Sequence, residues 1–514
     1  MLQFEVYLEG EKATDVELTG AYLFGQDSIP VRAELVADGG LITCVKKVPG
    51  AAGLTMLWEA GSAGKFMLST TRLPEREQPY CLNLEMARGQ MMRLIQKFEE
   101  WGLFDYGDAQ HLVDELDTVK HGFIEALKAD TPGGAARMAD EALAAGVTLG
   151  EKMALFHAEI FLSRRKGPAS RAGFGCTVDL SSAPTEKTQE LLRDAFDFIT
   201  VPLPWKQIEP KEGQCQFALA DAWVNWAVTN RKRILAGPLL SFQQDHMPEW
   251  LYVFEHDYDN LRDVAYEHIQ QVVKRYEKHV RAWHVVSGIH AHNSFNFSFE
   301  QLMELTRMSC MLVKKVAPKA QAVIDVVMPW GEYYATNTRS IPPMLYADMA
   351  VQSGVKFDAF GLQLFMGAAT EGHFVRDLMQ LSAMLDEFVQ MGKPLHITAI
   401  GAPSELSADA GDAFEGKALA SAGGRWHAPW SQRLQAEWLQ AVYRVAMSKP
   451  YVESISWRDL TDSQPHYMPH GGLCQSDTEP KLAYKELRNF RVFLATPRTA
   501  AGANPAAGNT SSKV

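Results

Sequence analysis

The stretch that decides the fold is residues 281–297, which read RAWHVVSGIHAHNSFNF. Its first half is apolar, with Trp283, Val285 and Val286, and the pattern changes at Ser287 to small and polar residues. A buried strand that runs into a functional loop has this pattern. The stretch therefore predicts the end of a strand in a barrel.

Other apolar segments of similar length lie on both sides of this one, and longer amphipathic stretches follow them. Together with residues 282–287, the predicted strands are residues 172–176, 198–202, 233–238, 322–327, 359–365, 395–400 and 454–457. Eight strands that alternate with helices fit a (β/α)8 TIM barrel better than an open doubly wound sheet. No glycine-rich phosphate loop follows any of them, so nucleotide binding is unsupported. The fold class is α/β, with the barrel over residues 167–495.

Two smaller regions precede the predicted barrel. Residues 1–81 alternate between apolar and polar positions in short segments separated by turns, which predicts a small antiparallel β domain. We interpret it as a packing domain, with a carbohydrate-binding module as the alternative. Residues 82–166 carry apolar residues at helical spacing and predict a connector of three helices. Residues 496–514 have no apolar period and predict a disordered tail.

Composition limits the partners of the chain. The formal net charge of -12 and the pI near 5.7 argue against nucleic acid and anionic membranes as partners, which require a basic face. The first residues lack the basic cap and apolar core of a secretory signal, and no segment has the apolar length of a membrane span. We therefore expect a soluble, cytoplasmic protein. Six scattered cysteines without metal-ligand spacing indicate reduced thiols, so we expect neither a metal nor a cofactor.

Aromatic and amide side chains dominate the predicted carboxyl ends of the strands, where barrel proteins carry their chemistry. Flat rings stack on the apolar faces of sugars, while amides and carboxylates bind the hydroxyl groups. This lining suits an uncharged glycan. The candidate substrate-binding residues are Trp205, His290, His292, Asn293, Trp330, Tyr333, Gln363, Trp457 and Arg458.

An ordered set of motifs from residue 174 to residue 487 resembles glycoside hydrolase family 10, the xylanase family. The motifs are WKQIEP at 205–210, PEW at 248–250, WHVV at 283–286, FDAFGLQ at 357–363, PLHIT at 394–398 and EPKLAY at 479–484. The resemblance implies a barrel that binds a β-linked polysaccharide or oligosaccharide.

The chain departs from the family pattern at the positions that matter most for catalysis. The resemblance places the acid/base glutamate at Gly288 and the nucleophile at Ala399. The resemblance also predicts a histidine shortly after Gln363, and this chain has Phe365 there instead. Glycine and alanine can neither transfer a proton nor attack an anomeric carbon, so the two-carboxylate mechanism cannot operate at these positions.

Other carboxylates near strand ends could replace them. Glu332 and Asp462 are the best candidates for displaced catalytic acids, with Asp325 and Asp459 behind them. Glu332 has a structural alternative, since it could cap a helix that begins near Tyr333. 

His290 and His292 form a His-x-His pair, which on an extended segment would place both rings on one face. Two ligands are too few for a metal site, so we expect these histidines to bind a hydroxyl group.

Three functions remain open from the sequence. The first is a glycoside hydrolase of altered mechanism, the second a catalytically inactive sugar-binding pseudoenzyme, and the third a scaffold. The aromatic rim favours the first two. We therefore predict a carbohydrate-active barrel related to endo-1,4-β-xylanases, with turnover left open.

Overall fold

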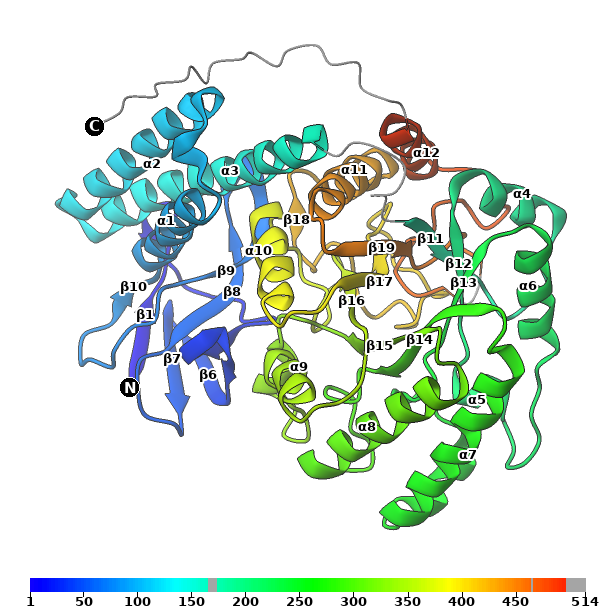
Figure 1. Cartoon of the computed structure of the whole chain (residues 1–514). Helices are drawn as coiled ribbons and strands as arrows, with labels where there is room; N and C mark the ends of the chain where they lie inside the picture. The colour runs from blue at the N-terminus through cyan, green and yellow to red at the C-terminus, as the bar shows by residue number, and fades with distance from the viewer. Residues whose placement is uncertain (165–172, 464–465, 496–514) are drawn as a thin grey trace, which may run out of the picture.

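A closed barrel of eight parallel strands forms the centre of the computed structural model, which describes residues 1–164, 173–463 and 466–495 (Figure 1). The strands follow one another around the barrel in chain order. All eight strands expected from the sequence are present within two residues at either end, so the (β/α)8 fold is confirmed. They are β11 (Gly173–Thr177), β12 (Phe198–Val201), β13 (Arg233–Ala236), β14 (Val280–Ser287), β15 (Gln321–Val326), β16 (Ala359–Phe365), β17 (Leu395–Gly401) and β19 (Val452–Trp457). The predicted tail, residues 496–514, lies outside the described residues.

Side chains fill the barrel interior, which is a packed core. One buried layer consists of Phe198, Leu235, Ala282, Val323 and Ala359, one residue from each of β12 to β16. The Phe198 ring fits because its neighbour on β11 is a glycine: a Cβ on that residue would lie 2.0 Å from the ring. Helices surround the barrel. They are α4 (Glu186–Ala195), α5 (Trp205–Ile208), α6 (Ala218–Thr229), α7 (Tyr258–Tyr276), α8 (Phe299–Val316), α9 (Pro343–Gln352), α10 (Leu378–Val389), α11 (Gln432–Ser448) and α12 (Leu482–Ala495).

Two small, mainly antiparallel sheets precede the barrel, together with a separate antiparallel pair of β2 (Tyr7–Leu8) and β3 (Glu11–Lys12), as expected for the first region. One sheet has the order β10-β1-β7-β6 and the other β18-β9-β8-β4-β5. The last strand to join, β18 (Arg425–Trp426), comes from the loop between β17 and α11 of the barrel and pairs antiparallel with β9. The remaining strands are β1 (Leu2–Glu5), β4 (Tyr22–Phe24), β5 (Pro30–Val31), β6 (Ala33–Asp38), β7 (Leu41–Lys46), β8 (Gly53–Glu59), β9 (Gly64–Ser69) and β10 (Tyr80–Cys81).

Three helices connect the sheets to the barrel, as the sequence predicts. They are α1 (Leu82–Glu100), α2 (Gln110–Lys128) and α3 (Pro132–Arg164). Leu112, Leu116, Val119 and Phe123 recur at helical spacing and form the buried face of α2. Helix α3 packs against α1 and α2 and also against α10 and α11 of the barrel, so that the sheets and these helices lie together on one side of the barrel (Figure 1).

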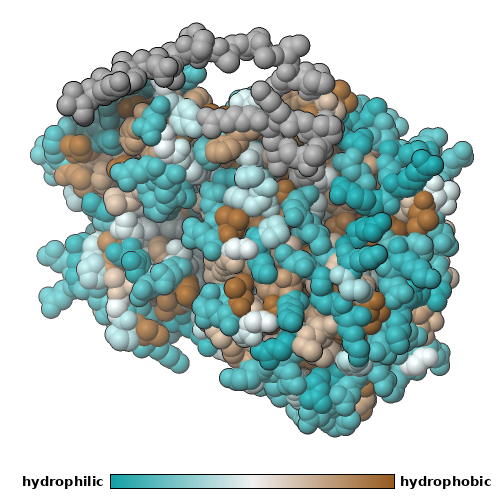
Figure 2. Space-filling view, in the orientation of Figure 1, coloured by the Kyte–Doolittle hydropathy of each residue, from teal (hydrophilic) through white to brown (hydrophobic). Residues whose placement is uncertain are grey.

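The surface carries little continuous apolar area on the side that Figure 2 shows, where hydrophilic residues predominate. Helix α2 leaves Ile124 and Leu127 about half exposed, and hydrophobic patches lie over this helical region in Figure 2. Within the described part of the chain, none of the helices has the length and apolar character needed to cross a membrane.

Glu151 of α3 is a buried carboxylate that ties the connector to the barrel. Its Oε1 accepts hydrogen bonds from Trp426 Nε1 at 2.7 Å and from the Leu378 backbone N–H at 3.3 Å. Its Oε2 lies 2.9 Å from Nε2 of His427. A carboxylate from the connector thus contacts the start of α10 and the β18 segment.

This contact predicts a pH-dependent contribution to stability. Hydrogen bonding to Glu151 raises the pKa of His427 above its ordinary value of 6.5. The contribution is therefore fully present below that value and is lost as the pH rises through the raised pKa of the folded state. We expect the difference in melting temperature between the natural protein and His427→Gln to be largest near about pH 6 and to shrink by about pH 9. The control is His279→Gln at an exposed histidine, and a difference that is constant with pH would contradict the prediction.

Candidate functional site

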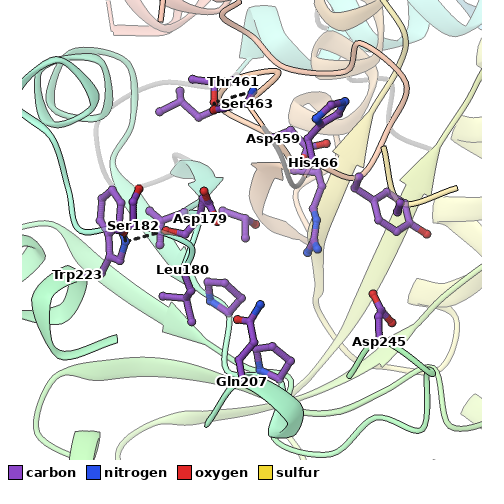
Figure 3. A pocket seen from close by; sticks show the side chains of 18 of the residues that line it. Asp179, Leu180, Ser182, Gln207, Trp223, Asp245, Asp459, Thr461, Ser463 and His466 are labelled. Atoms are coloured by element: carbon purple, nitrogen blue, oxygen red, sulfur yellow. Dashed lines mark hydrogen bonds between the residues drawn. The ribbon is translucent and has the colours of Figure 1, made fainter. Parts of the chain in front are cut away.

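A continuous cleft lies over the carboxyl ends of the barrel strands. It consists of three connected cavities of about 840, 210 and 30 Å³. Gln243 and Tyr467 line all three. The smallest cavity is the floor, where Thr200, Thr398 and Ala399 at the strand ends face the interior. Figure 3 shows the largest cavity. The cleft therefore occupies the position at which barrel proteins hold their ligands.

A cluster of rings forms one wall of this cleft. The Phe365 ring lies 4.4 Å from the Tyr467 ring and stacks on His373 at 5.3 Å, while Phe414 contacts both Tyr467 and His373 at 5.6 Å. Burial lowers the pKa of His373 to about 4, so this ring is neutral at physiological pH. Phe365 stands where the family resemblance expects a histidine, and a histidine from the following loop packs against it. The wall thus offers uncharged ring faces to a ligand.

Of the two positions that the resemblance makes catalytic, Ala399 lines the floor cavity and Gly288 directly follows the end of β14. Ala399 pairs in register with Gln363, and Gln363 Nε2 donates to Ser287 Oγ at 3.3 Å. Gly288, which follows Ser287, has a φ of +64°, a conformation that favours glycine. A Cβ there would lie 3.0 Å from Val327 and 3.1 Å from His292. The backbone and packing at this position therefore suit a residue without a side chain.

A buried histidine and a buried aspartate lie side by side at the floor of the cleft. His284 Nδ1 of β14 is 3.6 Å from Asp325 Oδ2 of β15, and both residues line the floor cavity. Burial lowers the pKa of His284. Neither His284 Nε2 nor Asp325 Oδ1 has a hydrogen-bond partner among the described residues. The pair therefore provides a polar floor.

The two sequence-predicted catalytic carboxylates lie outside the set of residues that lines the cleft. Glu332 is buried and pairs with Arg376 at 2.7 Å, and its second oxygen accepts the Gly372 backbone N–H. Asp462 lies 2.5 Å from Lys481 Nζ and accepts the Gly472 N–H at 2.8 Å. These contacts occupy both carboxylates, although their catalytic role stays a prediction.

Three other aspartates face the largest cavity. Asp179, Asp245 and Asp459 reach it from three different loops (Figure 3). Asp179 and Asp245 are exposed. Asp459 accepts the Met468 backbone N–H at 3.2 Å, and burial raises its pKa. Asp459, which the sequence places behind Glu332 and Asp462 as a candidate acid, is therefore the cleft carboxylate whose pKa is raised by burial.

The cleft includes four of the nine predicted substrate-binding residues. His292 and Tyr333 line the middle cavity, Gln363 lines the middle and floor cavities, and Arg458 lines the floor and the largest cavity. Trp330 lines a separate cavity of about 310 Å³ between the N-terminal sheets and the barrel.

The other four predicted residues make contacts inside the protein. Trp205 stacks on His268 at 4.3 Å, and Trp457 Nε1 donates to the Gly471 carbonyl at 2.9 Å. Asn293 Nδ2 donates to the Phe297 carbonyl at 2.8 Å. These three side chains line none of the three cavities of the cleft.

The expectation that both histidines of the His-x-His pair face one side is wrong. The segment is a turn, closed by a hydrogen bond of 2.8 Å from the His292 N–H to the Gly288 carbonyl. It directs His290 into the core, where its ring stacks on Tyr346 at 5.1 Å. Only His292 reaches the cleft. Over residues 1–164, 173–463 and 466–495, no three His, Cys, Asp or Glu side chains group as a metal site.

Fold and site define a (β/α)8 barrel with a polar, partly aromatic cleft at the carboxyl ends of its strands. The family model for glycosyl hydrolase family 10 matches residues 166–490, well over half of the chain. The chain therefore belongs to glycosyl hydrolase family 10.

Individual relatives are distant. Endo-1,4-beta-xylanase 3 of Hypocrea jecorina is 26% identical over 230 residues, which cover 43% of this chain and 63% of the relative. The match thus spans less than two thirds of that relative. Endo-1,4-beta-xylanase B of Thermotoga neapolitana is 20% identical over 298 residues, 56% of this chain and 78% of the relative. The crystal structure of xylanase 10B from Thermotoga maritima aligns with a TM-score of 0.48 at 19% identity and covers 63% of this chain and 97% of that chain.

Proposed function

We propose that this protein binds a β-linked glycan or oligosaccharide in the cleft of its barrel. The observation that carries the proposal is the ring wall of Phe365, Phe414 and Tyr467 beside the polar floor of Gln363, Thr200 and Thr398. Ring faces stack on pyranose faces, and amide and hydroxyl groups bind sugar hydroxyls. The chain belongs to glycosyl hydrolase family 10 and is similar to an endo-1,4-beta-xylanase, which supports a β-linked glycan as the ligand.

Calorimetric titration with xylotetraose and with cellotetraose tests this proposal. We expect saturable binding of at least one of them, and Tyr467→Ala to weaken it by about fivefold because a stacking ring is worth about 1 kcal/mol. Tyr252→Ala is the control, since Tyr252 is 41% exposed and lies outside the lining of the cleft. Absence of binding, or equal loss in both variants, would reject the proposal.

Hydrolysis is the second candidate function, and Asp459 is the observation that favours it. An acid with a raised pKa can donate a proton to a leaving group. An inverting mechanism then needs a second carboxylate about 6.5 to 9.5 Å away to activate a water molecule. Asp245 faces the same cavity and is the carboxylate proposed for that role. The inactive alternative rests on Gly288 and Ala399.

Release of reducing ends from the bound oligosaccharide separates these alternatives. If the cleft aspartates act, Asp459→Asn should lower the rate by at least about a hundredfold. Glu332→Gln, which breaks the buried ion pair with Arg376, should leave the rate per folded molecule unchanged. If Glu332 is the displaced acid predicted from the sequence, Glu332→Gln should lower the rate and Asp459→Asn should leave it unchanged. A glycan that binds but yields no product under any condition supports the inactive alternative.

A further inference from the structure

Arg458 is a cleft cation that forms no close ion pair with a carboxylate among the described residues. It follows β19 directly and lines both the largest cavity and the floor beside Ala399. Its guanidinium carbon lies 5.3 Å from the centre of the Tyr467 ring. Within the described part of the chain, its side chain makes no hydrogen bond and no ion pair. A guanidinium has five N–H donors.

The neighbouring carboxylates are held in other ways. Asp459 accepts the Met468 backbone N–H, and burial raises its pKa while the charge of Arg458 lowers it in part. Asp325 lies beside His284 on the floor. Asp245 is exposed in the wall of the largest cavity. None of the three pairs with Arg458. The donors of Arg458 are therefore available to an acceptor on a ligand.

We propose that Arg458 recognises a carboxylate on the bound glycan, so that the preferred ligand carries a uronic acid residue. A planar guanidinium binds a carboxylate through two parallel hydrogen bonds, which a neutral sugar cannot reproduce. This inference rests on the proposed function and departs from the uncharged glycan that the strand ends suggest.

The position of Arg458 favours direct recognition of a ligand carboxylate over a general electrostatic effect of the positive charges in the cleft. Lys206 lines the same cavity but is exposed, while Arg458 reaches the floor, where Gln243, Thr177 and Thr200 offer further polar groups. Asp245 has the opposite sign and opposes an anionic ligand. Arg458 thus acts as a local determinant of specificity within a cleft of mixed charge.

Two ligands with the same number of sugar rings test the proposal: xylotetraose, and xylotriose that bears one glucuronosyl residue. We expect the acidic ligand to bind at least about tenfold more tightly, because a hydrogen bond to a charged group contributes about 1.5 kcal/mol or more. Arg458→Gln should remove this preference, so that the two ligands then bind within about twofold of each other. Lys206→Gln should keep the preference, and Asp245→Asn should increase it.

Equal affinity of the natural protein for the two ligands would overturn the assignment, even if both bind well. So would an Arg458→Gln variant that loses both ligands to the same extent while its melting temperature is unchanged. If neither ligand binds to the natural protein, the proposed glycan-binding function itself fails, and the role of Arg458 fails with it.

Discussion

Arg376→Met should destabilise the protein by about 3–5 kcal/mol, because it leaves the Glu332 carboxylate buried without its partner. Glu332 and Arg376 are each 3% exposed at their side chains, and their closest atoms are 2.7 Å apart. The guanidinium also lies 4.6 Å from the Trp330 ring centre, a contact that methionine would keep only as apolar packing. Urea denaturation monitored by circular dichroism measures the loss.

The double variant Arg376→Met with Glu332→Gln identifies the cause. It removes both charges, so that we expect it to recover more than half of the lost stability. Arg433→Met is the control, since Arg433 forms an exposed ion pair with Glu437 and its loss should leave the midpoint unchanged. If Arg376→Met were as stable as the natural protein, the pair would have no structural role.

Gly361→Ala should cost about 3 kcal/mol, because the barrel interior has no room for the added methyl group. A Cβ at this position of β16 would lie 1.7 Å from Asp325 Oδ1 and 2.8 Å from Thr398 Cγ2. The aspartate would have to leave its position beside His284, which would also change the floor of the cleft. Loss of stability and loss of glycan affinity should therefore appear together.

A second substitution separates steric conflict from a general intolerance of alanine. The double variant Asp325→Ala with Gly361→Ala removes the atom that clashes. Its loss of stability should therefore be smaller than the sum of the losses of the two single variants. Gly107→Ala is the control, since nothing lies within 4 Å of a Cβ there. Simple additivity of the two losses would argue against the clash.

The barrel could be read from the sequence because its strands are buried on both faces. Segments such as 359–365 and 395–400 are short and largely apolar, and the structure has strands there. Strand ends were harder to interpret. Trp457 and Arg458 are adjacent, yet the first enters the core and the second the cleft. Register shifts in β14, β16 and β17 alter which residues face inward, and apolar pattern does not reveal them.

Much of the cleft wall comes from loops that carry no periodic signal. Phe414 and Tyr467 belong to the segments after β17 and β19, and their place beside Phe365 depends on tertiary packing. His373 could have been noticed as a histidine shortly after Phe365, where the family histidine is missing. Glu332 follows a barrel strand as a catalytic acid would, but it forms an ion pair with Arg376, which is distant in the sequence.

Pairing between β18 and β9 has a consequence for how this chain folds during synthesis. Most of the barrel separates these two strands in the sequence, so the second N-terminal sheet lacks its edge strand until the ribosome has made seven of the eight barrel strands. Contacts between such distant segments form slowly, and an open sheet edge in the meantime invites pairing with other chains. Pauses in translation before residue 425 should therefore favour aggregation of the nascent chain.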